Sequence, residues 1–156
     1  MIIDTVTLKD LDEIYKLERR SFKKDSFTKE LMLNLIIKNT YFFKLIDTES
    51  NHIIGFIIII QDRDKRVNVI NFLIRKRERK RGYGSFLLRH TLKKVKALDN
   101  IETIILNVNS KNKAAISLYQ KFNFRIVQRI ENYYRDKQNA YLMILNITSF
   151  SKNQYL

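Results

Sequence analysis

Residues 67–95 read VNVINFLIRKRERKRGYGSFLLRHTLKKV, and this stretch decides the fold. It starts as a strand-like run, passes through six cations and one acid at residues 75–81, and reaches the turn Gly82-Tyr83-Gly84-Ser85. The apolar residues that follow recur with helical spacing. Glycine lets a backbone approach a ligand closely, and the first N–H groups of a helix have no acceptor within it and favour anions. Strand, basic glycine turn and helix together predict a phosphate-binding site.

Composition bounds the class of protein. The chain has 156 residues, of which 45% are hydrophobic, so it suits one domain with an ample core. It has no cysteine, which excludes disulfides and thiolate zinc sites and fits a reducing, cytoplasmic setting. We expect no signal peptide and no association with a membrane. The longest apolar run, residues 53–60, is far short of the ~20 residues that span a bilayer.

The charge balance predicts anionic partners. Lys and Arg total 30 and Asp and Glu total 16, which gives a net charge of +14. Such an excess predicts attraction to a phosphorylated cofactor, to RNA or to an acidic protein surface, and charge alone does not choose among them. His52 and His90 have no companions at metal-ligand spacing, so we expect no metal site. The sequence leaves the oligomeric state open.

Hydrophobic periodicity predicts an α/β fold with the order β-α-α-β-β-β-α-β-α-β-β. Thr7, with Asp10 three residues later, forms a capping box that opens the first helix, and Thr28 caps the second. We expect one domain over residues 1–147 and a frayed tail at 148–156. The expected strands cover residues 2–6, 41–46, 53–60, 67–74, 101–108, 124–130 and 141–147, and the last two helices cover the segment after Gly84 and residues 111–122.

Three spaced blocks carry a family resemblance. Arg79-Lys80-Arg81-Gly82-Tyr83-Gly84 matches the cofactor signature Gln/Arg-x-x-Gly-x-Gly/Ala of the GCN5-related N-acetyltransferases (GNAT). Residues 106–119 resemble the ribosomal-protein and protein N-terminal acetyltransferase branch, in which a strand is followed by Asn-x-x-Ala-x-x-x-Tyr. Residues 131–134 and 140–143 resemble the last hairpin of that branch. The likeness covers nearly the whole chain in order and implies a mixed, mostly antiparallel central sheet.

The resemblance implies acetyl-coenzyme A as co-substrate. The amides from Arg81 to Ser85 would hold its pyrophosphate. The backbone at residues 73–75 would pair with its pantetheine arm, where one amide could polarise the thioester carbonyl. Asn112 would contact it from the next helix, although a residue at this position can equally satisfy the helix backbone. The implied cofactor contacts are Leu73, Ile74, Arg75, Arg79, Arg81, Gly82, Tyr83, Gly84, Ser85 and Asn112.

The resemblance also implies catalytic roles, with one departure. Tyr119 would protonate the leaving thiolate as general acid, or it is simply a core aromatic. At Asn107, ribosomal-protein acetyltransferases of this type carry a Glu that serves as general base, and Asn cannot accept the proton. Glu78 could take the proton through a bridging water. Alternatively, Glu78 only relieves the repulsion among the neighbouring cations.

Two features concern the acceptor. Tyr133 and Tyr134 match an aromatic pair that lines the peptide groove in such relatives, although they could also be interface or strand tyrosines. Gln138 and Asn139 stand where relatives often carry an acidic pair. Polyamines and aminoglycosides need carboxylates in the site, so this loss disfavours them as acceptors.

The missing base favours an acceptor that loses its proton easily. Deprotonating an α-amine of pKa ≈ 7.8 at pH 7 costs about 1 kcal/mol, against about 4.6 kcal/mol for lysine at ≈ 10.4. The predicted function is therefore direct acetyl transfer from acetyl-coenzyme A to the N-terminal α-amine of a protein or peptide. One alternative is a lysine acetyltransferase of a nucleic-acid-associated protein. The other is a non-catalytic module that binds RNA or the ribosome through its basic surface.

Overall fold

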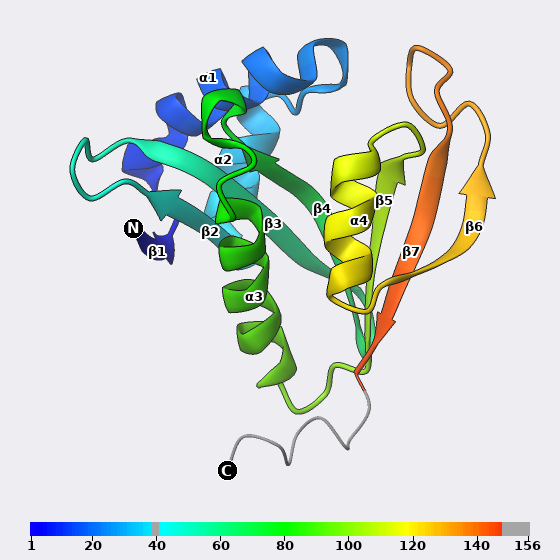
Figure 1. The fold of residues 1–156 in the computed structure, drawn as a ribbon. Helices are drawn as coiled ribbons and strands as arrows, with labels where there is room; N and C mark the ends of the chain where they lie inside the picture. Colours follow the sequence, from blue (N-terminus) through cyan, green and yellow to red (C-terminus); the bar gives the residue numbers. More distant parts are fainter. Residues whose placement is uncertain (39–40, 148–156) are drawn as a thin grey trace. The chain divides into compact units, whose positions relative to one another are not determined.

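The structure, a computed structural model, describes residues 1–38 and 41–147, so the expected tail at 148–156 lies outside the described residues (Figure 1). The order of strands and helices is the one that periodicity predicts. Three short 3₁₀ helices accompany them: η1 (Leu8–Asp10), η2 (Lys23–Asp25) and η3 (Lys76–Glu78). The strands and α-helices are β1 (Ile2–Thr5), α1 (Leu11–Phe22), α2 (Lys29–Ile37), β2 (Tyr41–Ile46), β3 (Ile53–Arg63), β4 (Arg66–Ile74), α3 (Tyr83–Lys96), β5 (Thr103–Asn109), α4 (Lys113–Lys121), β6 (Arg125–Ile130) and β7 (Ala140–Asn146).

The seven strands form a sheet with the order β1-β2-β3-β4-β5-β7-β6. The pairs β1–β2, β2–β3, β5–β7 and β6–β7 are antiparallel. The pair β4–β5 is parallel and joins residues 66–69 to residues 103–106. This arrangement confirms the predicted mixed, mostly antiparallel sheet.

The chain divides into two compact units, which are described separately below. Unit 1 comprises residues 1–59 and 71–91, and unit 2 comprises residues 60–70 and those from 92 onward. A single acetyltransferase domain over residues 1–147 remains a prediction. Among the residues that the structure describes, no helix is long and apolar enough to cross a membrane.

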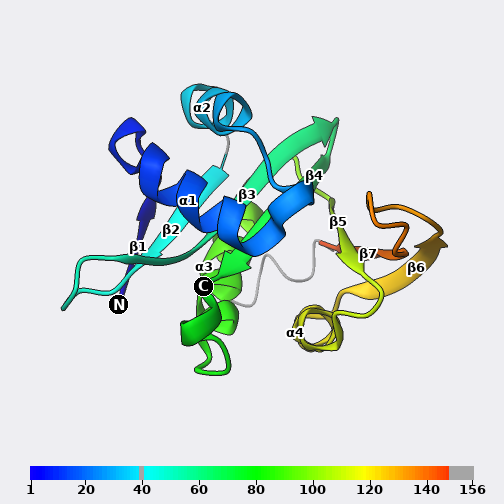
Figure 2. The ribbon, with the colours of Figure 1, turned by 90° about the horizontal axis from the view of Figure 1, so that it is seen from above.

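In unit 1, helices α1 and α2 lie on one face of strands β2–β4, and α3 starts on the other face (Figures 1 and 2). The predicted cap at Thr28 opens α2, whereas the capping box at Thr7 opens the 3₁₀ helix η1 and α1 begins only at Leu11. The Thr28 hydroxyl accepts a hydrogen bond from Leu31 N at 3.1 Å, and Thr7 N donates to Asp10 Oδ2 at 2.7 Å. Between the layers, the side chains of Ile14, Met32, Phe42, Phe56 and Leu88 are fully buried.

Gly55 sets the approach of β3 to the end of β4. A β-carbon at this position would lie 2.6 Å from the Leu73 carbonyl oxygen and 2.5 Å from Ile74 Cδ1. Real Cβ atoms do not approach backbone oxygens this closely, so only glycine lets these strands lie at their observed spacing. The glycine that interrupts the apolar run at residues 53–60 therefore fixes the place of the Leu73–Ile74 backbone.

In unit 2, β7 pairs with β5 along its whole length, from Thr103–Asn146 to Asn109–Ala140, and α4 follows β5 in the chain. Strand β3 is longer than the expected residues 53–60. It runs on to Arg63 because Asp62 and Arg66 form a bidentate ion pair, with N–O distances of 3.0 and 2.8 Å, beside the turn to β4.

Candidate active site

The glycine turn leads directly into α3, as the sequence predicts. Lys80 and Gly82 both adopt left-handed backbone conformations, with φ of 63° and 81°. The Gly82 carbonyl accepts a hydrogen bond from Phe86 N at 3.0 Å, which opens the helix. The chain therefore turns sharply just before the first helical amides, and glycine is the residue that adopts this geometry without strain.

The turn fits a diphosphate. A β-carbon built on Gly82 would meet no atom within 4 Å, so the space beside this backbone is open. The amides of Tyr83, Gly84 and Ser85 are the first of a helix of 14 residues and have no acceptor within it. Cationic side chains precede them at Lys80 and Arg81. Open space, unpaired donors and positive charge together match the requirements of a bound pyrophosphate.

The backbone at the end of β4 has two kinds of partner in unit 1. Arg75 N donates to the Ile54 carbonyl in β3 at 2.7 Å. Peptide groups alternate in direction along a strand, so the Ile74 backbone faces away from β3. There its carbonyl accepts a hydrogen bond from Arg79 Nε at 2.9 Å. A ligand that pairs with this carbonyl would take the place of Arg79.

Two more charged residues of this segment, Glu78 and Arg75, form ion pairs within unit 1. Glu78 is half-buried, and its Oε2 lies 3.0 Å from Arg81 Nη1. This is the arrangement expected if Glu78 relieves repulsion among the cations, and its service as proton acceptor remains a prediction. The Arg75 side chain turns towards α1, where it contacts Glu13 at 3.2 Å. The Leu73 side chain is buried in the core.

In unit 2, three predicted residues come together. Asn107 Nδ2 lies 3.1 Å from the Tyr133 hydroxyl. The Tyr133 and Tyr134 rings stand edge to face, with centroids 5.0 Å apart. Asn107 Oδ1 is buried and has no hydrogen-bond partner among the residues that the structure describes. A buried acceptor that lacks a donor carries a cost of about 1–3 kcal/mol, so a ligand N–H that reached it would be stabilised.

Two amide side chains hold the loop that carries the tyrosines. Gln138 Oε1 accepts a hydrogen bond from Asn109 Nδ2 at 2.7 Å. Asn139 Oδ1 accepts from Asn132 N at 3.0 Å, and the Asn139 carbonyl accepts from Ser110 N at 2.9 Å. At the positions where relatives often carry acids, this chain therefore uses neutral amides to tie the loop to the end of β5.

Tyr119 lies on α4 and is 7% exposed, with its ring 5.7 Å from that of Phe124. Burial raises the pKa of its phenol, and Tyr134 raises it further. The hydroxyl therefore stays protonated at neutral pH and has a proton to donate. Asn112 caps the same helix, because its Oδ1 accepts a hydrogen bond from Ala115 N at 3.1 Å. A contact between Asn112 and the cofactor remains a prediction.

Sequence reasoning missed a buried polar pair in unit 1. Glu18, on α1, is 0% exposed, and it accepts hydrogen bonds from Phe27 N at 2.9 Å and from Asn71 Nδ2 at 3.0 Å. Burial raises the pKa of the Glu18 carboxyl, although both hydrogen bonds oppose this shift. The signal was present in the sequence. Glu18 continues the apolar stripe of Ile14 and Leu17, and Asn71 occupies a buried register position of β4.

A glycine turn at the start of a helix, in a mixed sheet of this order, is the arrangement expected of the acyltransferase class that the three sequence blocks indicate. The sequence model of the Acetyltransferase (GNAT) family matches residues 8–124. The protein therefore belongs to the GNAT acetyltransferase family and is an acetyl-coenzyme A-dependent N-acetyltransferase. This confirms the family that the three sequence blocks indicate.

The relatives fall in the N-terminal acetyltransferase branch. An N-alpha-acetyltransferase of Sulfolobus acidocaldarius is 29% identical over 152 residues, which cover 90% of this chain and 89% of the relative. The crystal structure of Ard1 from Thermoplasma volcanium superposes with a TM-score of 0.84 at 26% identity and covers 95% of this chain and 98% of its own. A ribosomal-protein-alanine N-acetyltransferase of Escherichia coli shares the fold, with a TM-score of 0.83 at 23% identity over 99% of both chains.

Proposed function

We propose that the protein transfers an acetyl group to the N-terminal α-amine of a protein or peptide. The observation that carries the choice of amine is Asn107. Its amide oxygen is buried without a partner and can accept a hydrogen bond from an amine, but it cannot take up the proton. The name of the Sulfolobus relative agrees with this acceptor. A cytoplasmic location remains a prediction.

The energetics favour an acceptor that is already partly neutral. At pH 7, deprotonation costs about 1 kcal/mol for an α-amine and about 4.6 kcal/mol for a lysine side chain. A site that orients the amine without deprotonating it therefore acts on α-amines far faster than on lysines. The loss of a Glu at position 107 then restricts the acceptor without abolishing the activity.

The roles of the residues follow from their chemistry. Acetyl-coenzyme A supplies an activated acetyl thioester. The amides of residues 81–85 bind its diphosphate, and the backbone at residues 73–75 binds its pantetheine arm. Asn107 orients the amine, whose nitrogen bonds to the acetyl carbon as the carbon–sulfur bond breaks. Tyr119 gives its proton to the departing sulfur and regains one from solvent, and the proton that the amine loses passes to solvent.

Coenzyme binding tests the turn. In a Gly82→Ala variant, the turn would relax to negative φ in the free protein, and binding would have to restore the strained conformation. This strain is about 1–2 kcal/mol, so we expect coenzyme A affinity to fall by roughly fivefold to thirtyfold. Isothermal titration calorimetry measures this change. Lys93→Ala, an exposed change on α3, is the control and should bind like the wild type. If the Gly82 variant bound coenzyme A as tightly as the wild type, the turn would not be part of the coenzyme site.

Amine selectivity tests the acceptor. One peptide carries a free N-terminus and no lysine, and its partner carries a blocked N-terminus and one lysine. At pH 7 we expect the first to be acetylated faster by about 340-fold, the ratio of the two neutral-amine fractions. The gap should narrow as the pH rises, because the α-amine is already largely neutral while lysine continues to lose its proton. Thiol release measures both rates.

Two outcomes would contradict the proposal. Faster acetylation of the lysine peptide at pH 7 would favour the lysine acetyltransferase instead. No thiol release with any peptide, from a protein that binds coenzyme A, would favour a non-catalytic module. Since the calorimetric test needs no acceptor, it separates failure of the coenzyme site from failure of the acceptor assignment.

A further inference from the structure

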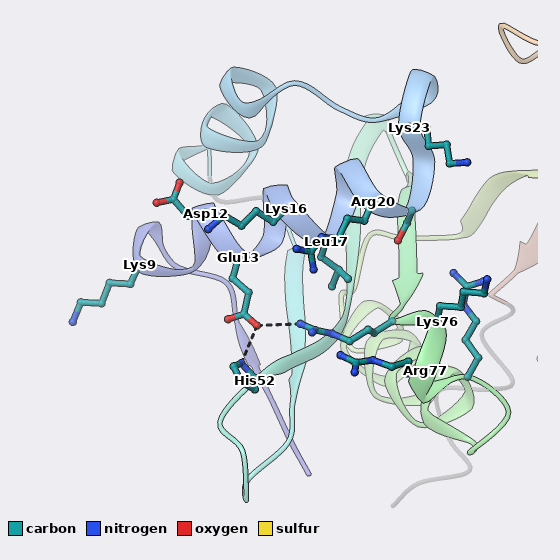
Figure 3. Close-up of a pocket in the computed structure, with 13 residues that line it drawn as sticks. Lys9, Asp12, Glu13, Lys16, Leu17, Arg20, Lys23, His52, Lys76 and Arg77 are labelled. Atoms are coloured by element: carbon teal, nitrogen blue, oxygen red, sulfur yellow. Dashed lines mark hydrogen bonds and ion pairs between the residues drawn. The ribbon is translucent and has the colours of Figure 1, made fainter.

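Unit 1 contains a cavity of about 830 Å³, and most of the side chains that line it have no role in the proposed reaction (Figure 3). It is lined by residues of α1, by His52 of the turn between β2 and β3, and by the segment at residues 75–79. The cavity is far larger than one phosphate ion and has room for several groups of a polymer. An extended molecule can therefore occupy it.

The lining is strongly cationic. Eight Lys and Arg side chains face two carboxylates, and both carboxylates are already paired. Asp12 lies 2.6 Å from Lys29, and Glu13 lies 3.2 Å from Arg75. Among the residues that the structure describes, six lining cations form no ion pair: Lys9, Lys16, Arg20, Lys23, Lys76 and Arg77. All six are exposed, so an anion can reach them.

Glu13 holds the two sides of this cavity in place. Its Oε1 accepts a hydrogen bond from Ile53 N at 3.0 Å and contacts Arg75 Nη2 at 3.2 Å and His52 Nδ1 at 3.6 Å. Arg75 Nη2 also donates to the Ile53 carbonyl at 2.8 Å. Figure 3 shows Glu13 reaching from α1 towards His52. The carboxylate thus acts as a structural clamp, and it leaves the surrounding cations available to a ligand.

The chemistry of the lining selects the kind of polymer. None of the described residues that line the cavity is Phe, Tyr or Trp, and eight of the 13 are Lys or Arg, which pair with phosphates. Such a lining favours the denser charge of a double helix over a single strand. The net charge of +14 adds long-range attraction for such a partner.

We propose that this cavity binds the phosphodiester backbone of a double-helical nucleic acid. The cations of α1 and of η3 contact phosphates, and no base is read. The two sources of this backbone, RNA and DNA, are distinguished by the test below. The proposal stands apart from the acetyl transfer, since it uses side chains that the reaction does not.

The test compares three double variants of equal charge change. Lys16→Ala with Arg20→Ala removes the α1 pair, and Lys76→Ala with Arg77→Ala removes the η3 pair. Lys93→Ala with Lys94→Ala, on exposed α3 positions outside the cavity, is the matched control. Fluorescence anisotropy with a short RNA duplex, a DNA duplex of the same sequence and one unpaired strand gives the affinity between about 50 and 200 mM salt.

We expect each cavity double variant to weaken duplex binding and to reduce the slope of log K against log salt by about 2, one for each lost contact. A slope of about −0.9 per contact corresponds to roughly eightfold in affinity between 1 M and 0.1 M salt. Each double variant should therefore bind roughly sixtyfold more weakly at 0.1 M. The control should keep the wild-type slope, and the single strand should bind more weakly than either duplex. Tighter binding of the RNA duplex than of the DNA duplex would identify RNA as the partner.

Three results would overturn the proposal. The first is an equal loss in the control, which would mean that only the net charge matters. The second is tighter binding of poly-glutamate than of duplex, which would indicate an acidic protein partner. The third is loss of duplex binding when coenzyme A is saturating, which would assign the cations to the coenzyme.

Discussion

Replacing Tyr119 with phenylalanine is expected to lower kcat by about 10²-fold or more, with little change in coenzyme affinity. The hydroxyl is the proposed proton donor to the departing sulfur, and phenylalanine keeps the buried ring in contact with Phe124. Steady-state thiol-release kinetics and calorimetry measure the two quantities. Tyr15→Phe, on the half-buried side of α1, is the control and should keep the wild-type kcat.

The raised pKa of Tyr119 predicts the shape of the wild-type pH profile. Burial raises the pKa of Tyr119 above the ordinary value of 10.0. The wild-type rate should therefore rise as the α-amine loses its proton near pH 7.8 and show no fall near pH 10 from ionisation of this phenol. A Tyr119→Phe variant with the wild-type kcat would show that the ring serves only the core.

Replacing Glu18 with alanine is expected to destabilise the protein by about 3 kcal/mol. The change leaves a cavity and removes the acceptor of two hydrogen bonds, those from Phe27 N and Asn71 Nδ2. Urea unfolding measures the loss.

Glu18→Gln is the matched variant, and we expect it to lie within about 1 kcal/mol of the wild type. Its carbonyl can still accept the hydrogen bond from Phe27 N. Asn71 Oδ1 is buried without a partner, so it can accept from the new amide once the Asn71 side chain turns over.

The sign of the pH dependence follows from the raised pKa of Glu18. A carboxyl whose pKa is higher in the folded than in the unfolded state contributes its full stability below the unfolded value, here 4.5. This contribution is lost as the pH rises through the folded value. Relative to Glu18→Gln, the wild type should therefore lose stability from about pH 4.5 upward, until the folded-state carboxyl is fully ionised. A stability difference between the two proteins that does not vary with pH would contradict this account of Glu18.

The sequence predicted the elements well because their signals are local. The residue pattern from 67 to 95 predicts a strand, a turn and a helix without reference to any other part of the chain. The structure has β4, η3 and α3 there. The Thr28 cap and the alternation of β4 are equally local. The three sequence blocks matched their family because each combines backbone demands, such as φ of 81° at Gly82, with spaced polar residues.

The partners of the site residues could not be predicted, because they depend on contacts between distant segments. The pairing of Asn107 with Tyr133 spans 26 positions, and that of Glu18 with Asn71 spans 53. The ion pair of Glu78 with Arg81 is local. The sequence nevertheless left two interpretations of Glu78 open, a proton acceptor and a residue that relieves repulsion among the cations. The one clue to Glu18 in the sequence was a charged residue within the apolar stripe of a helix. Its partner, Asn71, lies on strand β4 and could not be identified from the sequence.

The close approach of β3 to the end of β4 at Gly55 has a consequence for coenzyme binding. Because the Leu73 carbonyl and Ile74 lie against β3 with no room for one methyl group, the end of β4 cannot slide sideways within unit 1. A pantetheine arm that pairs with the outer edge of β4 therefore meets a backbone whose position is already fixed. Affinity is then not diminished by the entropy of ordering that backbone, which is the benefit of pre-organisation.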